Sequence, residues 1–164
     1  MASVTTSDLV IAATVFGGIL AGGNVDRVVV QMPAWRHMGA RSWAAYSRHA
    51  DLGNGLFLYP FVALSGALLT IAAAIAFHFD ATAPRSAAMP VYLAAALVAG
   101  GLLATIGAAP KMLSLRRIGD DPAALQKAFD GFELWGGVRA VFQVLAFGAN
   151  LWSLVLLLSK ALAS

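Results

Sequence analysis

The side chains best suited to chemistry lie on the last apolar stretch of the chain, residues 132–159. The rest of this stretch is mainly Leu, Val, Ala and Phe. A polar side chain is costly against lipid, so a polar stripe here should face other helices or a wet cavity. Arg139 would place a positive charge there, where it can stabilise a developing anion. At 100° per residue the stripe occupies about one 80° arc of a helix, formed by Phe132, Trp135, Arg139, Gln143, Ala146 and Asn150.

Composition places this stretch in a membrane protein. Of the 164 residues, 60% are hydrophobic and 12% are charged, and the mean hydropathy is +0.77. Soluble domains have about 45–50% apolar and about 25% charged residues. The chain has no cysteine, which excludes a disulfide framework, a thiol nucleophile and a zinc–thiolate site. No basic helix with interleaved aromatic residues lies outside the apolar stretches, so we expect no nucleic-acid partner.

Four apolar stretches have the length of membrane spans, and we expect one domain, residues 1–164. The predicted fold is an all-α integral membrane four-helix bundle. The spans should cover about 7–31, 54–78, 89–112 and 132–159. The first connection is rich in Trp, Tyr and Arg, which predicts an interfacial helix over 40–52. Asp121–Pro122 predicts the start of a short amphipathic helix, 123–129, before the last span.

The basic residues predict the orientation of the bundle. Only Arg85 and Lys160 belong to the side that carries the second connection and the two termini. By the positive-inside rule, the first and third connections are cytoplasmic and both termini lie outside, in a membrane of the bacterial inner-membrane type. The other Lys and Arg residues of the connections lie on the cytoplasmic side: Arg27, Arg36, Arg41, Arg48, Lys111, Arg116, Arg117 and Lys127.

With this orientation, polar residues from all four spans converge on the cytoplasmic half of the bundle. Two interpretations of Arg27 stay open: it snorkels to the interface beside Asp26, or it lines the same cavity as Arg139. Arg139 itself could pair with Asp26 or Glu133, or await a ligand. The convergent residues, which could also be ordinary headgroup-level side chains, are Asn24, Arg27, Asn54, Thr105, Lys111, Glu133, Trp135 and Arg139.

The chain resembles a four-span bacterial and fungal membrane family of unknown function that includes the anthrone oxygenases. The likeness rests on a glycine-rich first span that leads to a proline, Gly17 to Pro33, and on Thr105 followed by Pro110. Its strongest part is the Trp135-x-x-x-Arg139 opening of the last span. Met112 and Gly136 stand where family members often carry asparagine.

The resemblance implies a membrane enzyme that oxidises a lipophilic phenolic substrate with molecular oxygen, without a metal or flavin. The residues allow such chemistry: Arg139 could stabilise a phenolate or enolate, and Glu133, His49 or Asp26 could act as the base. We predict no cofactor and no metal site. The expected catalytic residues are Arg139, Glu133 and His49. The expected substrate-binding residues are Asn24, Arg27, Trp43, Tyr46, Asn54, Thr105, Lys111, Trp135 and Gln143.

Other classes of function compete with this one. The chain could bind a lipid, quinone or pigment, or serve as an accessory membrane subunit that forms a homo-oligomer through its glycine-rich faces. A transporter would need to dimerise to resemble inverted-repeat designs, and no clear internal repeat is present. A haem or metal site could use His37, His49, Asp51 and Glu133, although no pair has the ligand spacing of a helix. Membrane lipid and a lipophilic small molecule are the expected partners.

Overall fold

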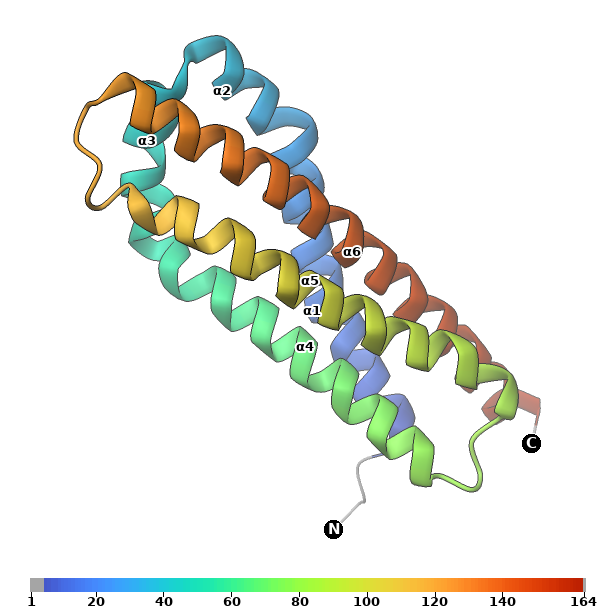
Figure 1. Cartoon of the computed structure of the whole chain (residues 1–164). Coiled ribbons are helices and arrows are strands. Elements are labelled where there is room, and N and C mark those ends of the chain that lie inside the picture. Colours follow the sequence, from blue (N-terminus) through green and yellow to red (C-terminus); the bar gives the residue numbers. More distant parts are fainter. Residues whose placement is uncertain (1–4, 164) are drawn as a thin grey trace.

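The computed structural model describes residues 5–163, with side chains up to residue 159, and this part of the chain contains helices and no strand. Four long helices run alternately up and down in one elongated bundle (Figure 1). Helix α1 packs against α4 and α6, and α5 packs against α4 and α6, which closes the ring. The four helices are α1 (Thr6–Asp26), α4 (Gly55–Phe79), α5 (Ala88–Ser114) and α6 (Pro122–Ala163).

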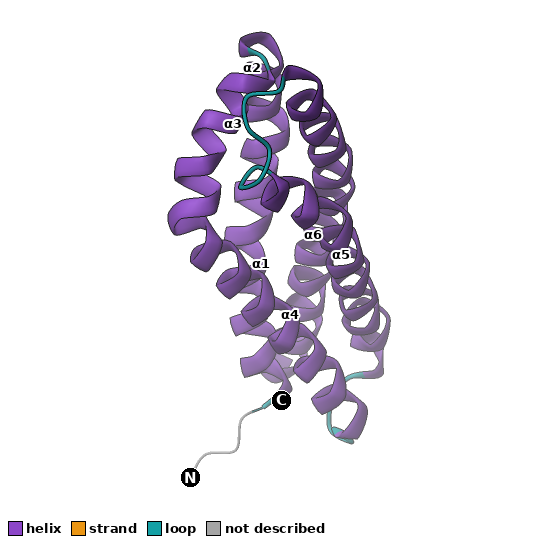
Figure 2. Ribbon diagram, turned by 60° about the vertical axis from the view of Figure 1, so that its left-hand side comes forward, coloured by secondary structure: helices purple, strands orange, loops and turns teal. Residues whose placement is uncertain are grey.

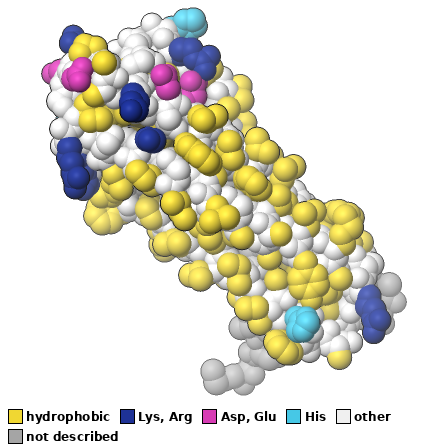
Figure 3. All heavy atoms as spheres, viewed as in Figure 1, with side chains coloured by type: hydrophobic (Ala, Val, Ile, Leu, Met, Phe, Trp, Pro, Cys, Tyr) yellow, Lys and Arg dark blue, Asp and Glu magenta, His cyan; other side chains and the backbone are white. Residues whose placement is uncertain are grey.

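The four predicted spans are confirmed as helices that are long and apolar enough to cross a membrane. Large apolar side chains cover the outside of the bundle, while the charged side chains gather toward its ends (Figure 3). This distribution defines an integral membrane four-helix bundle. We call the end that carries the α1–α4 and α5–α6 connections the basic end. The far end carries the α4–α5 loop.

The α4–α5 loop is fixed at the far end by Asp80. Its Oδ1 accepts hydrogen bonds from the backbone N–H of Thr82 at 2.9 Å and from the Thr82 hydroxyl at 2.6 Å. Its Oδ2 accepts one from the Thr6 hydroxyl at 3.1 Å, which ties the start of α1 to this loop. Hydrogen bonds from Thr82 hold the pKa of the Asp80 carboxyl below its ordinary value, because they stabilise the ionised form.

The first connection is more helical than expected. Helix α1 continues through a π-helical segment, η1 (Arg27–Gln31), into α2 (Met32–Met38). Gly39, with φ of 87°, then turns the chain. The predicted interfacial helix is present as α3 (Ala40–His49), which a second π-helical segment, η2 (Ala50–Asn54), joins to α4.

The amphipathic segment before the last span is not a separate helix. Residues 123–129 form the first turns of α6, which runs unbroken from Pro122 to Ala163. Pro122 suits the start of a helix, and no proline follows to interrupt it. Gly131, which could weaken the helix after its first turns, lies under the Lys111 side chain. A Cβ added at Gly131 would lie 3.1 Å from Lys111 Cε. The polar beginning and the apolar remainder of α6 therefore differ in surroundings, not in secondary structure.

Helices α2 and α3 fold over the basic end of the bundle (Figure 2). They are anchored by an apolar cluster, which we call the cap cluster. Trp43 is fully buried in it, with its ring 5.3 Å from that of Phe129 and 5.7 Å from that of Phe132. Burial of such aromatic area is a main source of stability. The buried members of the cap cluster are Met32, Trp35, Trp43, Ala44, Ala108, Met112, Leu115, Leu125, Ala128, Phe129 and Phe132.

Close packing of α5 on α6 gives a first testable prediction. A Cβ added at Gly107 would lie 2.5 Å from Cδ2 and 2.8 Å from Cγ of the Trp135 indole. We expect Gly107→Ala to lower the free energy of unfolding in detergent by about 1–3 kcal/mol, the usual range for overpacking. Gly148→Ala is the matched control, because nothing lies within 4 Å of its added Cβ. Equal stability of the two variants would contradict this packing.

Candidate functional site

A buried ion pair lies inside the bundle near the basic end. Arg27 Nη2 is 2.5 Å from Asp51 Oδ1, and the two residues are only 9% and 4% exposed. Arg27 Nη2 also donates a hydrogen bond to the Tyr59 hydroxyl at 3.2 Å. The guanidinium carbon lies 5.1 Å from the centre of the Tyr59 ring and 5.7 Å from that of Phe132. The Arg27 guanidinium is therefore held by the Asp51 carboxylate, by the Tyr59 hydroxyl and by the faces of the Tyr59 and Phe132 rings.

Both partners of this ion pair lie in π-helical segments. Arg27 is the first residue of η1, and Asp51 is the second residue of η2. Within η2 the backbone departs from helical geometry at Gly53, with φ of −89° and ψ of −120°. A π-helical turn takes more residues than an α-helical turn and is frequently found at functional sites. Here η1 directly precedes α2 and η2 directly follows α3, and these two segments bring the Arg27 cation and the Asp51 anion together.

The ion pair lies inside the apolar belt of the bundle. Val28, Val29 and Val30, the next residues of η1, are exposed on its outer side, as are Phe57 and Leu58 of α4. Side chains of this kind face hydrocarbon in a membrane protein. Of the two interpretations of Arg27, the structure therefore agrees with the buried one.

Arg139 completes the site from α6. It is half-buried and interacts electrostatically with Arg27, Asp51 and Tyr59. Its Nε is buried without a hydrogen-bond partner among the described residues. Asp26 is exposed and accepts a hydrogen bond from Gln31 instead. The site thus holds two guanidinium groups and one carboxylate, so one positive charge lacks a counter-charge.

Hydrogen-bonding capacity is left unused at this end of the bundle. Buried polar atoms in native proteins are nearly always hydrogen-bonded, so buried atoms without a protein partner are available to a bound molecule. Asp51 contributes an acceptor and Arg139 a donor, which suits a ligand group able to give one hydrogen bond and accept another. The described buried side-chain atoms without a partner are Gln31 Oε1, Trp43 Nε1, Ser47 Oγ, Asp51 Oδ2 and Arg139 Nε.

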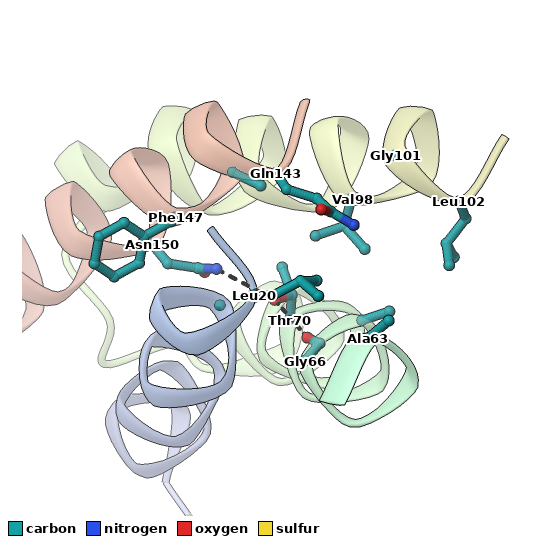
Figure 4. Close-up of a pocket in the computed structure, with 13 residues that line it drawn as sticks. Leu20, Ala63, Gly66, Thr70, Val98, Gly101, Leu102, Gln143, Phe147 and Asn150 are labelled. Carbon is teal, nitrogen blue, oxygen red and sulfur yellow. Dashed lines mark hydrogen bonds between the residues drawn. The ribbon is translucent and has the colours of Figure 1, made fainter. Parts of the chain in front are cut away.

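The polar stripe of α6 continues from this site into a cavity at the bundle centre (Figure 4). Asn24 Nδ2 donates to Gln143 Oε1 at 2.5 Å, and Asn150 Nδ2 donates to the Thr70 hydroxyl at 3.3 Å. Gln143, Asn150 and Thr70 line a small cavity of about 40 Å³. That volume and those amides suit a few water molecules. Walls from all four helices include Gly17, Leu20, Gly66, Val98, Leu102 and Phe147.

Several expected site residues lie elsewhere. His49 and Asn54 are exposed, and Tyr46 is 48% exposed with its ring against Trp35. Glu133 forms an ion pair with Arg36. The structure does not bring these side chains to the buried ion pair.

The remaining expected residues have structural surroundings of their own. Trp43 belongs to the cap cluster, and Trp135 is 41% exposed against the backbone of Gly107. Lys111 packs over Gly131, and the Thr105 hydroxyl donates to the carbonyl of Gly101 at 2.9 Å. From the expected set, the structure therefore brings together Arg27 and Arg139, with Asn24 and Gln143 next to them.

Asp51 and Tyr59 were not expected at the site. Asp51 is the only acidic residue between Asp26 and Asp80, which was a signal that a buried Arg27 had few possible partners. Tyr59 stands in an apolar stretch directly before Pro60, but nothing in its spacing points to Arg27. Within residues 5–163, no three His, Asp or Glu side chains come together in a way that could hold a metal ion.

Comparison with known proteins gives no relative from which a function could be inferred, so the inference of function depends on the fold and the site. The chain matches no protein-family model, no curated protein and no solved structure. Fold and site together define an integral membrane four-helix bundle with a buried Arg27–Asp51 pair at one end and an Arg139 whose Nε has no hydrogen-bond partner among the described residues.

Gly55 shapes the site through Tyr59. A Cβ at residue 55 would lie 2.7 Å from Tyr59 Cε2 and 2.9 Å from the carbonyl oxygen of Ala50. We expect Gly55→Ala to displace the Tyr59 ring from Arg27 and to lower the free energy of unfolding by about 1–3 kcal/mol. Gly22→Ala is the control, since its Cβ would meet nothing within 4 Å. Equilibrium unfolding in detergent measures both, and equal midpoints would refute this role of Gly55.

Proposed function

We propose that this protein is a small membrane enzyme that ionises a lipophilic phenolic or enolisable aromatic substrate and oxidises it with molecular oxygen. The observation that carries the proposal is that Asp51 and Arg139, which interact electrostatically, have an unused acceptor and an unused donor. The resemblance to the family of the anthrone oxygenases supports the choice of reaction.

The first chemical step is a proton transfer. A hydroxyl or an acidic C–H group of the substrate gives its proton to Asp51 Oδ2, while the negative charge develops on the substrate oxygen. Arg139 Nε donates a hydrogen bond to that oxygen, and the second guanidinium, Arg27, adds positive charge nearby. In this proposal Asp51 acts as the base, in place of Glu133, which is paired with Arg36, and of His49, which is exposed.

The second step oxidises the ionised ring. Oxygen attacks the carbanion carbon of a methylene group that lies between two aromatic rings. One oxygen atom becomes the carbonyl oxygen, and the other leaves as water with the two methylene hydrogens. The proton held by Asp51 ends in that water molecule. An electron-rich carbanion can react with oxygen directly, so the residues supply ionisation and charge stabilisation.

The basic end is proposed to face the cytoplasm. Exposed Arg36 and Arg41, with Arg116, Arg117 and Lys127, lie there, as the positive-inside rule requires. Reaction would then take place in the inner-leaflet half of the bundle. A thiol introduced at an exposed position such as Arg41→Cys should react with impermeant reagents only from the cytoplasmic side.

Oxygen uptake tests the proposed reaction. The purified protein in lipid nanodiscs is given anthrone, the simplest molecule of the proposed class, and an oxygen electrode follows turnover. We expect one O₂ consumed for each anthraquinone formed, faster than in empty nanodiscs, and loss of this excess rate in Asp51→Asn. Arg85→Gln, at the far end, is the control. A rate equal to that of empty nanodiscs would refute an enzyme of this specificity.

A second candidate function is binding without catalysis, of a quinol, lipid or pigment. It is favoured by the 2.5 Å contact of Asp51 Oδ1 with Arg27, since that ion pair already occupies one oxygen of the carboxylate. Absorption spectra of added 1-naphthol separate the two candidates. Binding as the naphtholate that depends on Arg139, without oxidation of anthrone, would favour the binding protein. A homo-oligomer through glycine-rich faces stays a prediction, which native mass spectrometry would test.

A further inference from the structure

The buried ion pair is closed at both ends of the bundle by apolar side chains. Toward the basic end lies the cap cluster, whose Phe132 ring lies against the Arg27 guanidinium. Toward the far end, a second apolar cluster fills the bundle beyond the central cavity. Its buried members are Val10, Ala73, Ala74, Phe77, Ala87, Val91 and Leu157. Along the bundle axis, the ion pair therefore has an apolar cluster on either side.

On the side of the bundle formed by α4, the ion pair is covered by the aromatic side chain of Tyr59. Tyr59 covers Arg27 from the outside and is itself 46% exposed, on the face where Phe57, Leu58 and Phe61 are also exposed. Next to it, a shallow groove on the surface of α4 is lined by Asn54, Phe57, Leu58 and Phe61. The Tyr59 ring thus lies between Arg27 and the exposed apolar face of α4.

Local structure allows the Tyr59 ring to lie in this position and to leave it. The ring rests on Gly55, where any Cβ would collide with it. It is attached to the site by one hydrogen bond, from Arg27 to its hydroxyl at 3.2 Å. Rotation of an exposed side chain about its first bonds is fast compared with enzyme turnover. A change of one rotamer would therefore expose Arg27 and Asp51 to the membrane.

We infer that the site takes its ligand sideways from the hydrocarbon of the membrane, past Tyr59, and not from water. The ligand is then a molecule dissolved in the bilayer, whose acidic hydroxyl group reaches the ion pair within the apolar belt. This inference rests on the proposed function only in treating the buried pair as a ligand site. Tyr59 acts as a selectivity residue, because it admits flat apolar molecules from lipid while the cap cluster excludes soluble anions.

The absence of cysteine allows a direct test, since one introduced thiol is the only thiol in the chain. Asn24→Cys places it one helical turn before Arg27, at a buried position. Two reagents are compared in nanodiscs: neutral N-ethylmaleimide and anionic 2-sulfonatoethyl methanethiosulfonate. The arginines should attract the anion, so its failure to react would mean that the route from water is closed.

The expected result has two parts. N-ethylmaleimide should label Asn24→Cys, and the sulfonate should label it much more slowly. Adding Tyr59→Ala removes the ring and its bond to Arg27, and should speed labelling by N-ethylmaleimide about tenfold or more. Leu58→Ala is the matched control, because it also removes a large exposed side chain but leaves Tyr59 in place, and it should not change the rate.

Three results would overturn the inference: equal labelling by both reagents, no acceleration in Tyr59→Ala, or equal acceleration in Leu58→Ala. If Asn24→Cys does not fold, Ser47→Cys replaces it, since the Ser47 hydroxyl is fully buried and has no hydrogen bond to lose. Labelling depends on access and not on turnover. It can therefore support lateral access even if anthrone is not oxidised, and it can fail while anthrone oxidation succeeds.

Discussion

Asp51→Asn should be among the most destabilising single substitutions in this protein. The change keeps the size of the side chain but removes the negative charge that faces Arg27 at 2.5 Å. Loss of one partner leaves a buried charge uncompensated, which costs about 3–5 kcal/mol. We expect a loss of that size in the free energy of unfolding, measured by reversible denaturation in mixed detergent micelles. A loss below about 1 kcal/mol would indicate an exposed pair of the surface type.

A double substitution separates the stability of the pair from its function. Arg27→Met with Asp51→Leu replaces both charges by apolar side chains of similar size. Such exchanges are often neutral or stabilising, because the cost of desolvating two ions disappears. We expect the double variant to unfold near the wild-type midpoint but to bind no naphtholate and to oxidise no anthrone. Activity in this variant would exclude Asp51 as the base.

Arg139→Gln should have the largest effect on turnover. Removal of a donor aimed at a developing oxyanion costs about 10²–10³ in rate. Stability should change little, because Arg139 Nε has no hydrogen-bond partner to lose among the described residues. We expect the initial rate of anthrone oxidation to fall by about this factor, with the unfolding midpoint unchanged. The opposite pattern, normal turnover with lowered stability, would make Arg139 a structural residue.

A matched control for Arg139→Gln comes from the surface. Arg36→Gln removes the same charge but breaks only the ion pair with Glu133, in which the Arg36 side chain is 65% exposed. Surface pairs contribute about 0–1 kcal/mol. Oxidation and stability should both stay near wild type in Arg36→Gln. A fall in turnover equal to that of Arg139→Gln would show that total charge at the basic end, and not position, sets the rate.

Much of the fold could be predicted from the sequence because it depends on properties of single segments. Length and apolarity determine that a segment can span a membrane, and the four spans were found on that ground. The position of the basic residues at one end follows from the order of the connections. The inward orientation of Asn150 follows from the cost of an amide in lipid, and this residue is indeed buried on α6.

The composition of the site depended on tertiary structure. Asp51 reaches Arg27, 24 residues earlier, only because α2 and α3 turn back over the bundle and two π-helical segments redirect the chain. Periodicity reports the face of one helix, and it carries no information on which faces of different helices meet. His49, two residues before Asp51, was therefore expected at the site, but it is exposed. Length, apolarity and residue type predicted four membrane helices with polar residues gathered at one end, and only packing decided which carboxylate meets a buried arginine.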